Sequence, residues 1–148
     1  MKLMPRIVSK EAFCLGCKLC EIHCLVAHSR SRKILKTFTR EKDSITPRLV
    51  VEDTGRVSFA VQCRHCKDAA CMDACMTGAM HRDAESGAVL CDASLCVGCL
   101  MCVMVCTAGA VLRSRQGKVI SKCDLCLESG KPACVEHCPN EALVYEED

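Results

Sequence analysis

The sequence predicts an α+β protein made of two βαββαβ units, one inserted into the other. Three observations lead to this prediction. Sixteen of the 17 cysteines in the 148-residue chain fall into four runs of four. Short apolar or alternating segments, which are typical of strands, flank each run. The chain has three phenylalanines, one tyrosine and no tryptophan, too few aromatic side chains to fill the core of a domain of this length.

The clearest run is C-V-G-C-L-M-C-V-M-V-C, at residues 96–106, where two, two and three residues separate the cysteines. A loop with this spacing can wrap Cys96, Cys99 and Cys102 around three corners of a 4Fe-4S cube. Cys106 lies about one helical turn past Cys102, so its sulfur faces a second cube. The run therefore predicts an iron–sulfur site and a partner run elsewhere in the chain.

Zinc sites and disulfides are the alternatives for so many cysteines. A zinc site uses two separated C-x-x-C pairs rather than one continuous run. A disulfide scaffold needs an oxidising compartment, whereas residues 1–10 lack a secretory signal and the cysteine count is odd. No apolar run reaches the ~18 residues of a membrane span. We therefore expect reduced thiols in a cytoplasmic protein.

Strands and cysteine runs alternate along the chain. The expected strands cover residues 6–9, 45–51, 57–61, 79–82, 88–91, 110–113, 118–121 and 142–145. The runs are Cys14, Cys17, Cys20 and Cys24; Cys63, Cys66, Cys71 and Cys75; Cys96, Cys99, Cys102 and Cys106; and Cys123, Cys126, Cys134 and Cys138. The second and fourth runs are stretched by K-D-A-A and L-E-S-G-K-P-A, and such longer loops still reach three corners of a cube.

The order of these elements predicts how the runs share clusters. A two-cluster unit needs strand, run, strand, strand, run, strand, and residues 56–113 supply this order around the second and third runs. Residues 1–55 and 114–148 then form an outer unit that binds two more 4Fe-4S clusters. The expected ligand sets of clusters 1 to 4 are, in order, Cys14, Cys17, Cys20 and Cys138; Cys63, Cys66, Cys71 and Cys106; Cys96, Cys99, Cys102 and Cys75; and Cys123, Cys126, Cys134 and Cys24.

The remaining cysteine and three histidines lie close to these ligands. Cys91 falls in an expected strand, and we expect a buried free thiol rather than a substitute ligand. His23, His65 and His137 each precede a ligand cysteine. Because every ligand set is already complete, we expect these histidines to be hydrogen-bond donors or surface groups.

Basic residues also accompany the runs. Positive charge beside a cluster would raise its reduction potential, although we expect these side chains to be exposed: Arg64, Lys67, Lys122 and Lys131. The basic segment 28–42 is expected to be a solvated helix face, with a docking surface or compensation of cluster charge as alternatives. Core filling around the clusters is expected of Met72, Met76, Met80, Met101 and Met104.

Several classes of function are excluded by what the sequence lacks. It has no serine–histidine–acid set and no Gly-rich phosphate loop, and a cube with four cysteine ligands leaves no iron open to substrate. We expect an electron carrier rather than an enzyme. Four clusters with their thiolates would make the formal charge of +2 negative, and no nucleic-acid footprint is seen.

The four runs resemble the four-cluster, ferredoxin-like electron-transfer subunits of molybdopterin oxidoreductases, formate dehydrogenases and hydrogenases. The wording Q-C-R-H-C-K-D-A-A-C-M-D-A-C-M-T-G-A-M, C-V-G-C-L-M-C-V-M-V-C and K-C-D-L-C is most similar to the subunit that accompanies nickel–iron carbon monoxide dehydrogenase. The chain departs from the common pattern at Leu25, Met76 and Thr107, where proline is usual.

The resemblance implies an anaerobic relay of single electrons. Electrons would pass from a catalytic subunit to a ferredoxin, hydrogenase or flavoprotein, and the first candidate for the catalytic subunit is a carbon monoxide dehydrogenase. The alternative catalytic partners are a formate dehydrogenase, a hydrogenase or an aldehyde oxidoreductase. A protein that stores clusters or delivers them during maturation is the alternative from another class.

Overall fold

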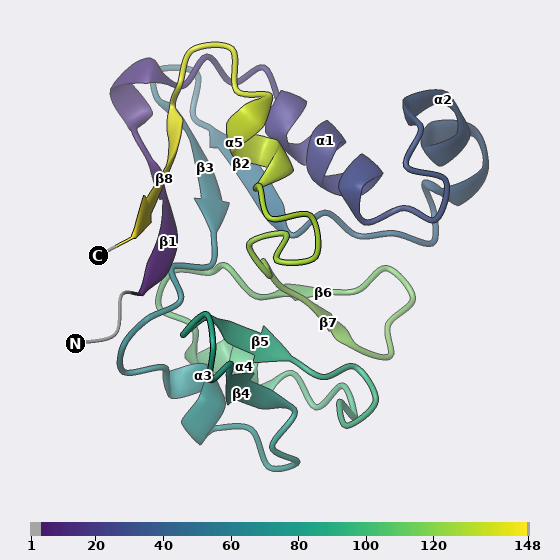
Figure 1. Cartoon of the computed structure of the whole chain (residues 1–148), viewed down its shortest axis with the longest axis vertical. Helices are drawn as coiled ribbons and strands as arrows, with labels where there is room; N and C mark the ends of the chain where they lie inside the picture. Colours follow the sequence, from purple (N-terminus) through teal and green to yellow (C-terminus); the bar gives the residue numbers. More distant parts are fainter. Residues whose placement is uncertain (1–3, 148) are drawn as a thin grey trace.

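A computed structural model describes residues 4–147 as an α+β chain of short helices and two-stranded sheets (Figure 1). The strands are β1 (Pro5–Ser9), β2 (Leu49–Asp53), β3 (Ser58–Gln62), β4 (Met80–Arg82), β5 (Val89–Cys91), β6 (Leu112–Arg113), β7 (Ile120–Ser121) and β8 (Leu143–Glu147). The helices are α1 (Leu19–Ala27), α2 (Ile34–Lys36), α3 (Ala70–Asp73), α4 (Met101–Val105) and α5 (Ala133–Glu136), with a 3-10 turn η1 (Glu11–Phe13) and a π-helical turn η2 (Thr37–Glu41). The outermost residues of the expected outer unit, 1–3 and 148, lie outside the described residues.

The sheets join the chain in two ways. β2 with β3, β4 with β5, and β6 with β7 are antiparallel hairpins of consecutive strands. β1 instead pairs with β8, with Ile7 opposite Tyr145, so the two ends of the chain lie side by side (Figure 1). All eight expected strands are present, and the first strand pairs with the last.

The expected strand boundaries differ from the observed ones by up to four residues, and two of these differences have a visible cause. The strand expected at 45–51 begins only at Leu49, because Pro47 has no N–H for a ladder. The carbonyl oxygens of Thr46 and Pro47 instead accept the Ser121 hydroxyl at 3.3 Å each. β6 is shorter than expected because the backbone N–H of Ala110 donates to a cysteine sulfur rather than to a strand.

The elements form two groups along the longest axis (Figure 1). One holds β1, β8, α1, α5, β2 and β3; the other holds α3, α4, β4 and β5, and β6 with β7 lies between them. The expected unit boundaries, 55/56 and 113/114, fall in the turns of the β2–β3 and β6–β7 hairpins. Each of these hairpins therefore gives one strand to each expected unit.

Cysteines take a large share of the core. Cys20, Cys24, Cys63, Cys123 and Cys134 are buried in one cluster with Ile7, Leu49, Leu125 and Leu143. The methionines depart from expectation: Met80 is buried, but Met76, Met101 and Met104 are exposed. On α4 the buried residue is Cys102, so Met101 and Met104 lie on the outer side of this short helix.

The basic segment 28–42 forms a projecting hook around α2 (Figure 1). Its base is closed by Glu41, whose carboxylate accepts the backbone N–H groups of Arg30 and Ser31. Leu35 is 81% exposed at the tip. Within the described residues, no helix has both the length and the apolar character needed to cross a membrane.

Candidate iron–sulfur sites

Left-handed backbone turns recur in each cysteine run. In the first run Gly16 and Lys18 have φ of +65° and +60°, and in the third run Gly98 and Leu100 have +70° and +63°. His65 in the second run has φ of +48°, and the fourth run has a similar turn at Leu125 and Cys126. These turns curl each loop, so that successive cysteines can point to one centre.

The expected ligands of cluster 1 share one pocket, although they come from opposite ends of the chain. Cys14, Cys17, Cys20 and Cys138 all line it. The pKa of Cys20 is raised to about 12, mainly by burial, with a contribution from the nearby thiols of Cys17 and Cys138. The β1–β8 ladder therefore brings the last cysteine of the fourth run to the first run.

The expected ligands of cluster 4 are also close neighbours. Burial raises the pKa of Cys134 well above its ordinary value, and the thiols of Cys123, Cys24 and Cys126 add to this effect. Contacts between α1, which carries Cys24, and α5, which carries Cys134, hold this group together.

Three of the four expected ligands of cluster 2 lie together. Burial raises the pKa of Cys71, and the nearby thiols of Cys63 and Cys106 raise it further. The fourth expected ligand, Cys66, is exposed and directly follows the left-handed turn at His65.

Cluster 3 is expected to combine the third run with the end of the second. Burial raises the pKa of Cys102, as do the thiols of Cys96 and Cys99. Cys75 is a neighbour of Cys91, which is in turn a neighbour of Cys96 and Cys102. The structure thus gathers the thiols of this set around the end of β5.

Backbone N–H groups donate to sulfurs of expected ligands in all four runs. The pairs are Arg48 to Cys24 (3.3 Å), His65 to Cys63 (3.4 Å), Met80 to Cys75 (3.5 Å), Ala110 to Cys106 (3.4 Å) and Leu125 to Cys123 (3.4 Å). Such bonds stabilise thiolates, which are the form that binds metal. Groups of buried thiols with these donors fit iron–sulfur clusters, whose binding would release the thiol protons.

Thiols of different expected sets are also neighbours. Cys20 of the first expected set raises the pKa of Cys134 of the fourth. Cys63 of the second raises the pKa of Cys123 of the fourth, and Cys102 of the third raises the pKa of Cys71 of the second. These neighbours place the expected sets next to one another in the order 1, 4, 2 and 3.

Cys91 is half-buried on β5 rather than fully buried as expected. Its pKa is raised to about 12, mainly by burial, with a contribution from the neighbouring thiol of Cys96. Cys20 has a similar pKa, so this shift does not distinguish Cys91 from the expected ligands, whereas its position outside the four runs does.

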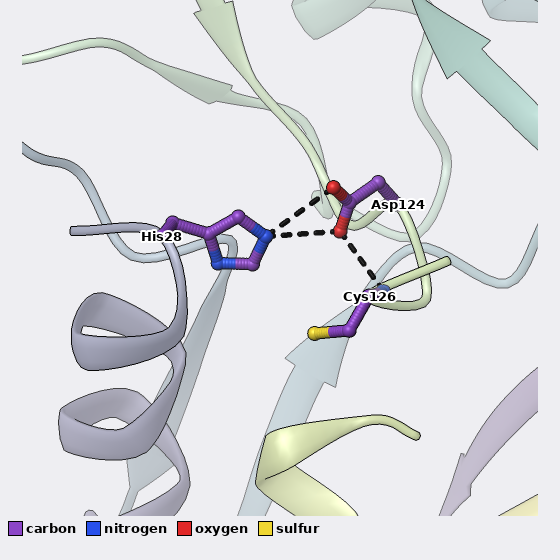
Figure 2. Close-up of side chains that lie close together, drawn as sticks. All are labelled: His28, Asp124 and Cys126. Atoms are coloured by element: carbon purple, nitrogen blue, oxygen red, sulfur yellow. Dashed lines mark hydrogen bonds and ion pairs between the residues drawn. The ribbon is translucent and has the colours of Figure 1, made fainter. Parts of the chain in front are cut away.

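An ion-pair network lies beside the fourth set (Figure 2). His28 Nε2 lies 3.1 and 3.3 Å from the two carboxylate oxygens of Asp124, and Arg48 pairs with the same carboxylate. Burial lowers the pKa of His28, but the bonds to Asp124 and to the Cys24 sulfur together outweigh this effect and raise the pKa to about 10. Burial opposes the charge of Asp124, yet His28 and Arg48 hold the pKa of that carboxyl well below its usual range.

His28, Asp124 and Cys126 offer ligand atoms within 4.8 Å of one another, so a separate metal site was considered for them. The carboxylate already accepts bonds from His28, Arg48 and the backbone N–H of Cys126, the last at 3.1 Å (Figure 2). A guanidinium at this carboxylate opposes a further cation. We interpret the group as an ion pair that joins α1 to the fourth run. Sequence reasoning missed it, although His28 lies four residues after Cys24 and Asp124 directly follows Cys123.

The histidines beside the ligands differ from one another. His23 and His137 stack with ring centroids 3.6 Å apart and link α1 to the end of α5. His65 is only 1% exposed, and its Nδ1 accepts the N–H of Val89 at 3.1 Å. Burial and the nearby Lys122 ammonium lower the pKa of His65 to about 3, so the ring is neutral and its proton is on Nε2.

The His65 Nε2–H donor is buried and has no hydrogen-bond partner in the part of the chain that is described. An orphaned donor within a cysteine run fits a nearby sulfur acceptor that belongs to a cluster.

Lys122 contradicts the expectation of exposure, whereas Arg64, Lys67 and Lys131 are exposed as expected. Only 4% of Lys122 is exposed. Its Nζ donates to the carbonyl oxygens of Val89 and Cys123, the latter at 3.1 Å. No local pattern indicates this burial, because its cause is the edge of β5, which is distant in the sequence.

Comparisons with known proteins agree with the cysteine chemistry. The family described as the 4Fe-4S dicluster domain matches residues 56–148. An "Iron-sulfur protein" of Rhodospirillum rubrum is 40% identical and covers 93% of this chain and 79% of its own. "Electron transport protein HydN" of Escherichia coli (strain K12) is 35% identical, over 93% of this chain and 85% of that protein.

A longer relative and a solved structure extend the comparison. "Putative oxidoreductase UacF" of Escherichia coli (strain K12) is 35% identical over 96% of this chain, which spans only 21% of that protein. The active site complex BamBC of benzoyl coenzyme A reductase contains a chain with a TM-score of 0.57 and 17% identity. The match covers 99% of this chain and 79% of that one, and it shows a shared fold.

Proposed function

Because the chain belongs to the 4Fe-4S dicluster domain family, we propose that it relays single electrons through four 4Fe-4S clusters as a subunit of a larger redox complex. It is an iron–sulfur electron-transfer protein, as its relatives are. The observation that carries the count of four is the presence of sixteen run cysteines gathered into four neighbouring groups of thiols. When bound, each cluster accepts and passes on one electron at a time.

We assign the ligands by the nested arrangement. Cys138 with Cys14 in one pocket, and Cys24 beside Cys134, support the exchange of fourth cysteines between the first and fourth runs. Cys106 beside Cys71 supports the same exchange between the second and third runs. The β1–β8 ladder supports an outer unit of residues 1–55 and 114–148 around an inner unit of 56–113.

The order of the thiol groups supports a linear path through clusters 1, 4, 2 and 3. Clusters 1 and 3 would then be the two ends of the path, and clusters 4 and 2 would be internal. In this assignment each cluster has four cysteine ligands, so no iron is open to a substrate and the chain carries electrons only.

The first candidate for the electron donor is a carbon monoxide dehydrogenase, on the resemblance of the cysteine runs. A formate dehydrogenase, hydrogenase or aldehyde oxidoreductase is the alternative, and a ferredoxin, hydrogenase or flavoprotein would accept the electrons. The similarity to UacF supports a role for this chain beside a larger redox unit, because the similar region makes up about a fifth of a protein named as an oxidoreductase. The hook at 28–42, with exposed Lys33, Leu35 and Lys36, is the proposed docking surface for the donor.

The test uses the anaerobically purified protein. Chemical analysis should give about sixteen iron and sixteen sulfide per chain, and low-temperature EPR should show reversible reduction. The protein is then mixed with a carbon monoxide dehydrogenase plus carbon monoxide, and separately with a formate dehydrogenase plus formate, while cluster bleaching is followed.

The two mixtures distinguish the candidates. Bleaching with carbon monoxide supports the first donor, and bleaching only with formate moves the assignment to the second. Zinc in place of iron would overturn the proposal. Cluster transfer to an iron-free acceptor, without bleaching in either mixture, would favour storage or maturation.

A further inference from the structure

The free edge of β5 holds two side chains that come from different cysteine runs. Arg82 is the ladder partner of Val89, and the N–H and carbonyl of Val89 form their bonds away from β4. The N–H of Val89 donates to His65, which lies between Cys63 and Cys66 of the second run. The carbonyl oxygen of Val89 accepts from Lys122, which directly precedes Cys123 of the fourth run. One residue of an edge strand thus holds both side chains in place.

The bonds of Lys122 fit a charged amine. Its Nζ contacts carbonyl oxygens, and an ammonium has three donors and no acceptor. The charge is buried, and the nearby His65 ring accepts the Val89 N–H at Nδ1, so that nitrogen carries no proton. A buried cation of this kind needs negative charge nearby to be stable.

The negative charge is at hand on two sides. Lys122 Nζ donates to the carbonyl oxygen of Cys123 at 3.1 Å, and through Val89 it is joined to His65, whose backbone N–H donates to Cys63 Sγ at 3.4 Å. Cys63 belongs to the proposed set of cluster 2 and Cys123 to that of cluster 4. A cube with four thiolates carries a net negative charge in either of these positions.

We propose that Lys122 is a positioning residue that raises the reduction potentials of the two internal clusters, 2 and 4, above the values they would have without its charge. The inference rests on the proposed function, because it assumes four clusters. Reduction adds an electron to a cluster, so a nearby cation in a poorly hydrated site favours the reduced form. Electrons entering at either end would then be drawn to the middle of the path.

The experiment compares midpoint potentials in EPR-monitored redox titrations of the wild type, Lys122→Gln and Lys122→Arg. Glutamine keeps a donor for the carbonyl oxygens but loses the charge, and arginine keeps the charge. Lys67→Gln is the matched control, because Lys67 also adjoins a ligand cysteine, Cys66, but is exposed. Iron content is measured for every variant.

In Lys122→Gln we expect two of the four potentials to fall by the equivalent of at least a tenfold change in the reduction equilibrium, about 59 mV for one electron. The other two should move much less, Lys122→Arg should restore the wild-type values, and Lys67→Gln should change none of them. Cys63→Ser and Cys123→Ser should perturb the same two signals, which identifies them as clusters 2 and 4.

Unchanged potentials in a Lys122→Gln protein with full iron content, or an equal shift of all four, would overturn the inference alone. If Lys122→Gln loses iron, Lys122→Met replaces it, since a thioether leaves no buried donor unpaired. Loss of iron in both neutral variants would overturn the inference in favour of a purely structural role. A wild-type protein without reversibly reducing clusters would overturn the proposed function itself.

Discussion

At the scale of single residues, Cys91 offers a test of the ligand assignment. Local patterns place it outside the four runs, so Cys91→Ala should keep about sixteen iron per chain. Cys75→Ala, a change to a cysteine in the same neighbourhood, should lose about four iron or convert one cluster to a three-iron form. Iron analysis and EPR measure both results, and iron loss from Cys91→Ala would show that it is a ligand.

The side chains around the runs could not be predicted from local patterns in the same way. Burial of Lys122 and His65 depends on the edge of β5, which is far from either residue in the sequence. Local patterns carry no information about such contacts, and a lysine beside a cysteine is usually exposed.

At the scale of elements, the order of strands was predicted correctly and their ends were not. Alternation of apolar residues reveals a strand, but its end depends on competing partners for the backbone. β2 starts late because Pro47 and Thr46 face Ser121, and β6 is short because Ala110 is bonded to Cys106. In both places the deciding partner belongs to another element or to a ligand loop.

Gly98 in the third run should be sensitive to a single methyl group. A Cβ at this position would lie 2.5 Å from the backbone oxygen of Lys118, in addition to the strain of φ +70°. Gly98→Ala should destabilise the protein by about 2–4 kcal/mol, the sum of left-handed strain and overpacking.

Gly55 is the matched control for this change, with φ of +79° and nothing within 4 Å of its added Cβ. Gly55→Ala should cost about 1–2 kcal/mol, from strain alone. Thermal loss of the visible cluster absorbance compares the two variants. Equal midpoints would mean that Lys118 moves aside without cost.

Exchange of the fourth cysteines tests the nesting of the two units. Cys138→Ala should damage the cluster held by the first run, because the β1–β8 ladder brings Cys138 into the pocket of Cys14. Cys106→Ala should damage the cluster held by the second run, where it adjoins Cys71. EPR of each variant shows which signal is lost. A tandem arrangement would instead make Cys138→Ala disturb the cluster held by Cys96.

At the scale of the whole molecule, the clusters take the place of an ordinary hydrophobic core. Five buried cysteines lie in the main core cluster, and the largest fully buried side chains are His65, Val89 and Thr37. Removing iron should therefore leave repelling or poorly packed thiol groups instead of a core. The aromatic-poor sequence predicted this dependence, although not where each cluster would adjoin the next.

Anaerobic chelation of iron should accordingly unfold the protein in one cooperative transition. The measurement is far-UV circular dichroism and NMR, followed together with the visible cluster absorbance. An iron-free protein that keeps the β2–β3 and β4–β5 hairpins in its NMR spectrum would contradict this expectation.

The hook at 28–42 offers a surface for electron exchange, and its charge makes a kinetic prediction. Lys33 and Lys36 are exposed on either side of Leu35, so an apolar contact is framed by positive charge. Attraction between such a rim and an acidic partner speeds the encounter and is screened by salt. Lys36→Glu should therefore slow electron transfer from the donor several-fold at low ionic strength, and added salt should reduce the difference.

Arg56→Glu is the control, because it makes the same charge change in the exposed β2–β3 turn, away from the hook. It should have little effect on the rate measured by stopped-flow bleaching. Equal slowing by both variants would mean that the partner senses the net charge of the protein and not this surface.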